Sequence, residues 1–262
     1  MMYFLYSFFL GAAVGSFVNV LIDRTMVGQD WVAGRSRCDH CQKNLAWYDM
    51  IPILSYVAYR GKSRCCMTPL SWRYPIVEIL VGLLFGWWLA VGFMFFRLVS
   101  APLAIVQPGF WLVTGVVLTI LALSDLFYGL VLLPIVWVGV SITFVYRLIL
   151  WHYGAYQLVD LGSALLVAGG FFGFFWLLHK LTRGKGMADG DMYIALYMGL
   201  LMGWPRGVVA LALSFILGAV TGIGLIVLGI CSRKETVPFV PFMVGAIVIT
   251  LLWGEKLIRF VS

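Results

Sequence analysis

Long stretches without a charged side chain are the feature that most restricts what this chain can fold into. A helix needs about 20 apolar residues to cross roughly 30 Å of hydrocarbon. With 63% apolar and 11% charged residues, a soluble fold of 262 residues would expose too much hydrocarbon. We therefore predict an all-α polytopic membrane protein with about eight transmembrane helices. The candidate spans lie between charged residues, at 1–22, 78–97, 97–125, 125–147, 160–180, 191–206, 206–233 and 235–255.

One long polar interval, residues 23–74, interrupts this pattern. It contains Pro52, Pro69 and four of the five cysteines. We predict three parts for the chain: a first transmembrane helix at 1–22, a small cytoplasmic cysteine-containing domain at 23–74, and a membrane domain at 75–262 with about seven transmembrane helices. We expect the fifth cysteine, Cys231, to be a packing residue at the end of a span.

The lysine and arginine positions indicate the orientation, since cationic residues accumulate in cytoplasmic loops. With the amino terminus outside, only Arg97, Arg147, Arg206, Lys256 and Arg259 fall on the outer side, and the other thirteen of the eighteen fall on the cytoplasmic side. The net charge of +7 then follows from topology, and no soluble basic face indicates nucleic-acid binding. The first apolar run has no basic residue before it, so we expect a retained span rather than a cleaved signal.

Asp125 is the only charged side chain between residues 98 and 146. A charged group inside a span costs about 2.5–3.5 kcal/mol on insertion scales, so its position needs a reason. Two spans of ordinary length fit into this interval only if the chain turns close to Asp125. The predicted topology places this turn at the cytoplasmic end.

Asp191 lies in the segment GKGMADGDMYIALYMGLLMGW, residues 184–204. Only fourteen uncharged residues separate it from Arg206, which is about 21 Å of helix and too short to cross. We therefore expect the helix to begin at or before Ala188, so that Asp191 lies about one turn inside the membrane. The amino-terminal end of this helix is also predicted to be cytoplasmic. Asp125 and Asp191 can therefore approach each other at a similar depth.

Two carboxyl groups brought together in a poorly solvated place share one proton, because both cannot ionise cheaply. A pair of carboxyl groups that shares one proton is what aspartic proteolysis requires. We expect Gly190 to let a backbone or an extended peptide approach without a side chain in the way. The alternative is that each acid caps a helix at the interface, for which Asp189 is the more convincing candidate.

Six ordered blocks of sequence, which extend over almost the whole chain, resemble the bacterial type IV prepilin peptidases, membrane aspartic proteases of the GxGD type. The blocks are GSFVNVLIDR (15–24), SRCDHCQKNLAWYDMIPILSYVAYRGKSRCC (36–66), LSWRYPIVE (70–78), LSDLFYGL (123–130), GMADGD (186–191) and VPFVPFMVGA (237–246).

The resemblance implies that Asp125 and Asp191 are the catalytic residues. It implies cleavage of the basic leader peptide of prepilins or pseudopilins at the cytoplasmic face of the bacterial inner membrane, with the amino terminus in the periplasm. It also implies methylation of the new amino terminus from S-adenosylmethionine, for which no binding residue is identified.

The chain departs from the family pattern at several positions. The first glycine of the GxGD motif is Ala188, and Met192–Tyr193 replaces an apolar residue followed by lysine. The proline after the first aspartate is delayed to Pro134, and Val240 stands where glycine is typical.

Cys38 and Cys41 form a C-x-x-C pair, a spacing that presents two thiolates to a tetrahedral metal. In the resembling family a second C-x-x-C pair follows, but here its first position is Ser63. Cys66 fits the fourth ligand position and Cys65 is the candidate substitute for the missing one. We predict a structural zinc site of Cys38, Cys41, Cys65 and Cys66, with His40 as a substitute ligand. Reduced, unligated thiols are the alternative in a cytoplasmic loop.

The remaining signals are weaker. Glu78 is either functional or paired with Arg73, and His152 and His179 are expected to be interfacial rather than catalytic. Gly169, Gly170, Gly173, Gly218 and Gly222 favour close packing between helices. Two other functions stay open: a transporter that relays protons through Asp125 and Asp191, and a catalytically inactive assembly factor that keeps the fold despite the altered GxGD motif.

Overall fold

The structure of the chain is a computed structural model that describes residues 2–29, 35–38, 40–95, 103–183, 187–230 and 237–261, with side chains through Lys256. Cys231 lies outside the described residues. The described residues form helices and no strands, apart from isolated β-bridges in the loops between α1 and α3. Contacts divide the chain into two compact units, Met1–Val116 and Val117–Ser262.

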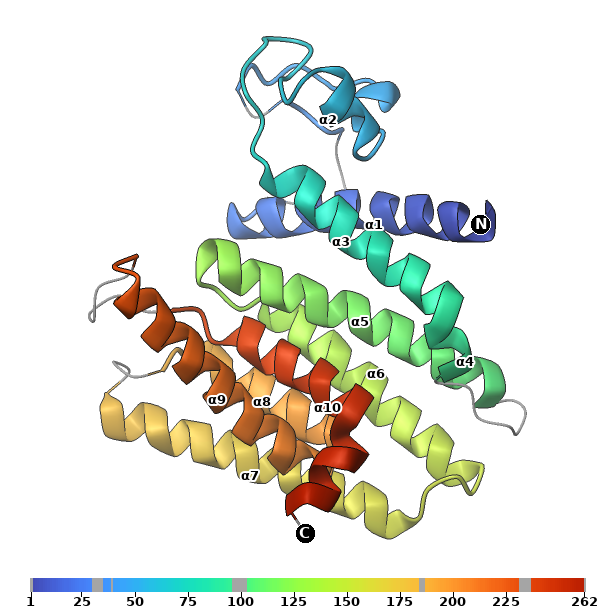
Figure 1. Cartoon of the computed structure of the whole chain (residues 1–262), viewed down its shortest axis with the longest axis vertical. Helices are drawn as coiled ribbons and strands as arrows, with labels where there is room; N and C mark the ends of the chain where they lie inside the picture. The colour runs from blue at the N-terminus through green and yellow to red at the C-terminus, as the bar shows by residue number, and fades with distance from the viewer. Residues whose placement is uncertain are drawn as a thin grey trace. The chain divides into compact units, whose positions relative to one another are not determined.

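The long helices confirm the predicted all-α polytopic architecture (Figure 1). Six stretches are long and apolar enough to cross a membrane. They are α1 (Met2–Met26), α3 with η2 and α4 (Arg73–Trp87, Trp88–Gly92 and Phe93–Phe95), α5 (Leu103–Tyr128), α6 (Leu133–His152), α7 (Leu158–Thr182) and α9 (Arg206–Val227).

The other two predicted spans also correspond to helices. Helix α10 (Val240–Val261) has 22 residues. Helix α8 (Asp189–Met202) has 14 residues, which is too short to cross a bilayer. Helix α8 starts one residue after the latest predicted start, Ala188, which is its N-cap.

The predicted domain boundaries at 22/23 and 74/75 stay a prediction. Helix α1 runs to Met26, beyond the predicted end of the first span. The loops that follow contain only the short helices η1 (Trp47–Met50) and α2 (Leu54–Ala58).

In the first unit, α1 packs against α3 through small residues on both helices. A Cβ on Gly15 would lie 2.8 Å from the Cα of Glu78, and a Cβ on Gly82 would lie 2.8 Å from a ring atom of Phe8. Gly11 and Gly86 have similarly close neighbours, so these four positions exclude a larger side chain.

The expected ion pair between Arg73 and Glu78 is wrong. Arg73 instead donates to the carboxylate of Asp23 on α1, at 2.6 Å. Glu78 is buried, and its Oε2 accepts a hydrogen bond from the backbone N–H of Ile53 at 2.7 Å. Glu78 therefore ties the loop that contains Ile53 to α3.

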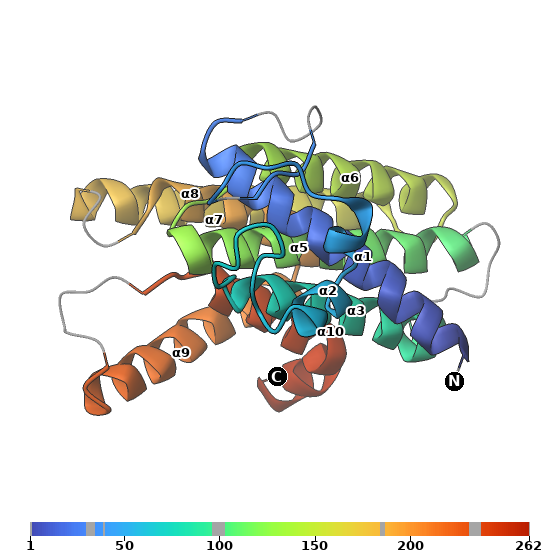
Figure 2. The ribbon, with the colours of Figure 1, turned by 90° about the horizontal axis from the view of Figure 1, so that it is seen from above.

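In the second unit, α8 is the central element. It contacts α6, α7, α9 and α10, and Figures 1 and 2 show it beside α7. Its buried residues are Asp191, Ile194, Ala195, Tyr197, Met198, Gly199, Leu200, Leu201 and Met202. The close contact with α7 occurs at Gly199, where a Cβ would lie 2.7 Å from the Cα of Ala168.

Arg147 explains how α8 can end inside the unit. Arg147, which is predicted to lie on the outer side, is buried in α6 with 6% of its surface exposed. Its Nε donates to the carbonyl of Leu200 at 2.6 Å, and its guanidinium also donates to the carbonyl of Leu201 at 3.3 Å. The last carbonyls of a helix have no partner within the helix, so Arg147 supplies one.

Most of the glycines that were expected to pack between helices do not. A Cβ on Gly169, Gly170, Gly173 or Gly222 would meet no atom of the described residues within 4 Å. Of that set, only Gly218 has close neighbours, the rings of Phe239 and Phe242.

Candidate functional site

Asp125 and Asp191 come together in the second unit from two separate helices. Asp125 lies in the last turn of α5, and Asp191 lies in the first turn of α8. Their exposed fractions are 6% and 5%, and their charges interact. The two helices therefore bring the aspartates together as predicted; the catalytic role of the two residues stays a prediction.

The start of α10 orients Asp125. The backbone N–H of Val240, the first residue of α10, donates to Oδ2 of Asp125 at 3.0 Å. The amino terminus of a helix presents free N–H groups and a partial positive charge, which suit a carboxylate partner. Helix α5 then ends at Gly129, whose φ of +62° is one that glycine adopts without strain.

The residue before α8 orients Asp191. The backbone N–H of Ala188 donates to Oδ2 of Asp191 at 3.2 Å. Asp191 thus caps its own helix, and the expectation that Asp189 is the cap is wrong. The carboxylate of Asp189 is largely exposed and lies 2.9 Å from Nε2 of His179.

The two small residues of the Ala188-Asp189-Gly190-Asp191 motif have different structural surroundings. Ala188 has φ −73° and ψ 152°, an extended conformation open to any residue, so alanine fits where the family has glycine. A Cβ on Gly190 would lie 2.5 Å from Cγ2 of Val131, in the turn between α5 and α6. Gly190 therefore lets α8 approach the turn that follows Asp125. The neighbour that approaches it is a side chain of this chain, not the backbone or peptide that was expected.

The other departures from the family pattern are also accommodated. Tyr193, in the place of lysine, has ring contacts with Trp137 of α6 and Phe172 of α7. Val240, in the place of glycine, is fully buried and contributes its backbone N–H to Asp125. At Tyr193 and Val240 the difference is therefore a packing or main-chain interaction within the second unit.

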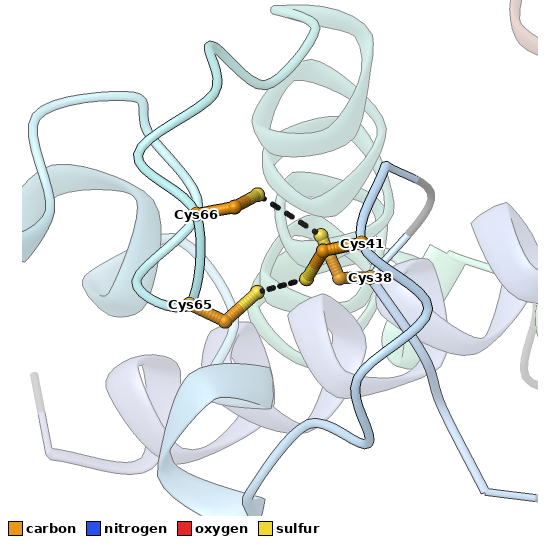
Figure 3. A group of neighbouring side chains, drawn as sticks. All are labelled: Cys38, Cys41, Cys65 and Cys66. Carbon is orange, nitrogen blue, oxygen red and sulfur yellow. Dashed lines mark hydrogen bonds between the residues drawn. The ribbon is translucent and has the colours of Figure 1, made fainter.

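Four cysteines gather in the loops between α1 and α3 (Figure 3). Cys38 faces Cys66 with 3.6 Å between their sulfur atoms, and Cys41 faces Cys65 at 3.0 Å. All four sulfur atoms lie within 4.8 Å of one another. Tetrahedral zinc with Zn–S bonds of about 2.3 Å would separate sulfur ligands by about 3.8 Å, so the four thiols fit such an ion. His40 is not part of this cluster.

Two turns of the same design present these thiols. In the first, Cys38 N–H donates to Lys43 O and Gln42 N–H donates to Cys38 O. In the second, Ser63 N–H donates to Thr68 O and Met67 N–H donates to Ser63 O. Ser63 therefore occupies the place of Cys38, and Cys66 occupies the place of Cys41. Cys65 lies between these two positions and supplies the missing sulfur.

The thiols of the cluster differ in acidity. Burial raises the pKa of Cys38, but hydrogen bonds from the backbone of Cys41 and the hydroxyl of Ser63 outweigh burial and lower it to about 6. The hydroxyl of Ser63 lowers the pKa of Cys65, but the thiol of Cys41 and burial outweigh it and raise this pKa to about 12. Cys38 therefore ionises more readily than Cys65.

The chain was compared with known proteins. A family model described as the bacterial peptidase A24 N-terminal domain matches residues 9–92, which include most of α1, the cysteine loops and the whole of α3. A protein of Aeromonas hydrophila named prepilin leader peptidase/N-methyltransferase is 29% identical over 99% of this chain and 93% of its own length. This chain is similar to bacterial prepilin peptidases over nearly its whole length.

Other proteins named prepilin leader peptidase/N-methyltransferase match this chain to a similar degree. The protein of Pseudomonas aeruginosa is 29% identical over 95% of this chain and 90% of its own length. That of Myxococcus xanthus is 33% identical over 82% of this chain and 61% of its own length. No solved structure matches the chain.

Several residues around the aspartates had no signal in the sequence. Val240 and Val131 contact the aspartate segments from positions that are distant in sequence. The N–H of Ala188 reaches Asp191 because of the local backbone geometry. His179 was expected to be interfacial, yet it contacts two residues of the GMADGD segment. Its separation of ten residues from Asp189 gives no periodic pattern that would have linked them.

Proposed function

We propose that this protein is a membrane aspartic endopeptidase that removes the leader peptide of prepilins or pseudopilins, with Asp125 and Asp191 as the catalytic pair. The observation that carries the proposal is the pair itself, two buried carboxyl groups from separate helices whose charges interact. The relatives named prepilin leader peptidase/N-methyltransferase support the same activity.

The two carboxyl groups divide the chemistry between them. Ionising both would place like charges together in a poorly hydrated site, so the pair holds one proton. The ionised group takes a proton from water as the water attacks the scissile carbonyl, and the protonated group donates a hydrogen bond to the developing oxyanion. The N–H groups of Val240 and Ala188 each hold one carboxyl oxygen, which leaves the second oxygen of each aspartate for water and substrate.

The position of the acids favours hydrolysis over a transmembrane proton relay. Asp125 and Asp191 lie at helix ends, in the last turn of α5 and the first turn of α8. A transporter places its coupling acids near the middle of the bilayer. With the lysine and arginine distribution of the chain, the catalytic end is the cytoplasmic face of the inner membrane, with the amino terminus in the periplasm.

The experiment uses purified full-length protein in detergent with a prepilin that carries its leader. We expect cleavage by the wild type and a loss of at least about a thousandfold for Asp125→Asn or Asp191→Asn, because neither amide can exchange the proton. His152→Asn, an exposed residue at the end of α6, is the matched control. Full cleavage by either aspartate variant would remove that residue from catalysis. No cleavage by the wild type would favour the inactive assembly factor.

A second activity, N-methylation of the new amino terminus, is supported by the names of the relatives. S-adenosylmethionine would supply the methyl group, and we assign it no residues of this chain. Labelled S-adenosylmethionine with precleaved substrate tests this activity separately from cleavage. Absence of label on the precleaved pilin would restrict the protein to proteolysis.

We also propose that Cys38, Cys41, Cys65 and Cys66 hold a structural zinc ion. Zinc binding supplies folding free energy to small domains with few apolar residues. Metal analysis of the purified protein should show about one zinc per chain. It should show strong loss in Cys38→Ser and Cys66→Ser, and unchanged zinc content in these variants would contradict the assignment.

A further inference from the structure

His179 lies near the carboxyl end of α7 and contacts the segment that precedes Asp191. Its Nδ1 lies 3.0 Å from the carbonyl oxygen of Met187, and its Nε2 lies 2.9 Å from Oδ1 of Asp189. A carbonyl oxygen only accepts hydrogen bonds, so Nδ1 is the donor to Met187. The other ring nitrogen, Nε2, has the carboxylate of Asp189 as its neighbour.

The contact with Met187 reaches Asp191 through a single peptide group. The carbonyl of Met187 and the N–H of Ala188 belong to the same planar peptide unit. The oxygen of this unit accepts from His179, and its N–H donates to Oδ2 of Asp191 at 3.2 Å. Hydrogen bonds arranged in series polarise one another, so a donor at the oxygen strengthens the bond made by the N–H.

We propose that His179 is a positioning residue for Asp191, acting through the Met187–Ala188 peptide group. His179 fixes the plane of this peptide, and the peptide N–H then holds one oxygen of the Asp191 carboxyl group. The second oxygen of the Asp191 carboxyl group is then left for water and substrate. This inference rests on the proposed peptidase function, since it assigns a role in the geometry of the same aspartate pair.

The surroundings of His179 separate this role from ordinary stabilisation. Its side chain is 31% exposed and that of Asp189 is 75% exposed, and exposed ion pairs contribute little to folding stability. The neighbouring cation Lys180 lies over the ring of Trp176, at 4.9 Å from its centroid. The acidic side chain of Asp189 also suits the amino end of α8, at which it lies.

Four variants test the two contacts separately. In His179→Asn, the side-chain amide can take the place of Nδ1 and keep the bond to Met187. In His179→Gln, the amide reaches toward the place of Nε2 and keeps only the contact with Asp189. His179→Ala removes both contacts, and Asp189→Asn weakens only the ion pair.

We expect His179→Ala to lower kcat for leader cleavage by about ten- to a hundredfold with KM nearly unchanged, because a displaced catalytic group is costly while substrate binding is not involved. His179→Asn should recover most of the loss, and His179→Gln should not. Asp189→Asn should change kcat by about threefold or less. Wild-type kcat in His179→Ala, or equal recovery by His179→Gln and His179→Asn, would overturn the proposal.

A second measurement does not depend on activity. Hydrogen–deuterium exchange of the full-length protein in detergent, resolved to the amide of Ala188, should be faster in His179→Ala than in wild type or His152→Asn. Exchange from Ile194 to Met202 should stay unchanged, since the polar contacts of His179 are with Met187 and Asp189. Unchanged exchange at Ala188 would contradict the proposal even where cleavage is reduced. Absence of cleavage by the wild type would contradict the peptidase function but leave this measurement valid.

Discussion

Gly190 shows how one missing side chain decides the geometry of the aspartate pair. It permits the first turn of α8 to lie against Val131, directly after the helix that carries Asp125. The first small residue of the motif, Ala188, has an ordinary extended backbone and no such restriction. The two positions should therefore respond differently to substitution.

We predict that Gly190→Ala destabilises the protein by about 1–3 kcal/mol through overpacking and lowers cleavage strongly. Ala188→Gly should retain most activity. The double variant Gly190→Ala with Val131→Gly should recover part of the loss, because it removes the atoms that the new methyl group meets. Cleavage rates and thermal unfolding in detergent measure these effects, and a Gly190→Ala protein with normal activity would contradict the packing argument.

The environment of Glu78 allows a prediction about the stability of its variants. Its carboxylate accepts the N–H of Ile53, which has the unusual φ of +63° for a β-branched residue. Glu78→Ala leaves this N–H without its partner and should cost about 1–3 kcal/mol. Glu78→Gln keeps an acceptor and should cost less. Limited proteolysis of the loops between α1 and α3 reports the difference, and equal protection of both variants would exclude this role.

At the scale of helices, α8 depends on neighbours at both of its ends. Its first turn is held against the α5–α6 turn, and its last carbonyls are held by Arg147 of α6. A helix of 14 residues needs such partners, because it ends where water is scarce.

Arg147→Met should therefore leave the carbonyls of Leu200 and Leu201 without their donor. We expect destabilisation of about 1–3 kcal/mol for each carbonyl that finds no other partner. Arg147→Lys keeps one donor and should lie between Arg147→Met and wild type. Thermal unfolding in detergent tests this order, and an unfolding temperature of Arg147→Met equal to that of wild type would contradict it.

The two cysteine turns allow a prediction about ligand position. Since Ser63 occupies the place equivalent to Cys38, the double variant Ser63→Cys with Cys65→Ser should restore two regular C-x-x-C turns. It should bind zinc at least as tightly as wild type, whereas Cys65→Ser alone should bind more weakly. Competition with a chromogenic chelator measures both affinities. Weaker binding by the double variant than by Cys65→Ser would show that the turns are not equivalent.

At the scale of the whole molecule, the cysteine cluster and the aspartate pair lie in different compact units. Removal of zinc should therefore loosen the loops between α1 and α3 first, because the metal supplies part of their folding free energy. Exchange of the amides in α8 should stay nearly unchanged after treatment with a chelator. Hydrogen–deuterium exchange compares the two regions in one experiment, and equal loosening of both would indicate a single cooperative unit.

The membrane class and approximate helices were predictable from sequence because they depend on local quantities. Uncharged runs located the helices, with ends that differ by up to eight residues, and the short interval between Asp191 and Arg206 indicated the short α8. The C-x-x-C spacing and the position of Cys66 likewise indicated the turns that bring the thiols together. In each case the residues that decide the result are neighbours in the chain.

Tertiary structure decided which of several equivalent residues meet. The sequence contains many glycines, but only packing shows that Gly190 and Gly199 need to lack a side chain while Gly169 and Gly170 do not. Arg73 forms its ion pair with Asp23 and not with Glu78. The N–H of Ala188 donates to Asp191 and not to Asp189. These choices depend on the relative positions of helices distant in sequence, and local hydropathy, charge and spacing carry no information about those positions.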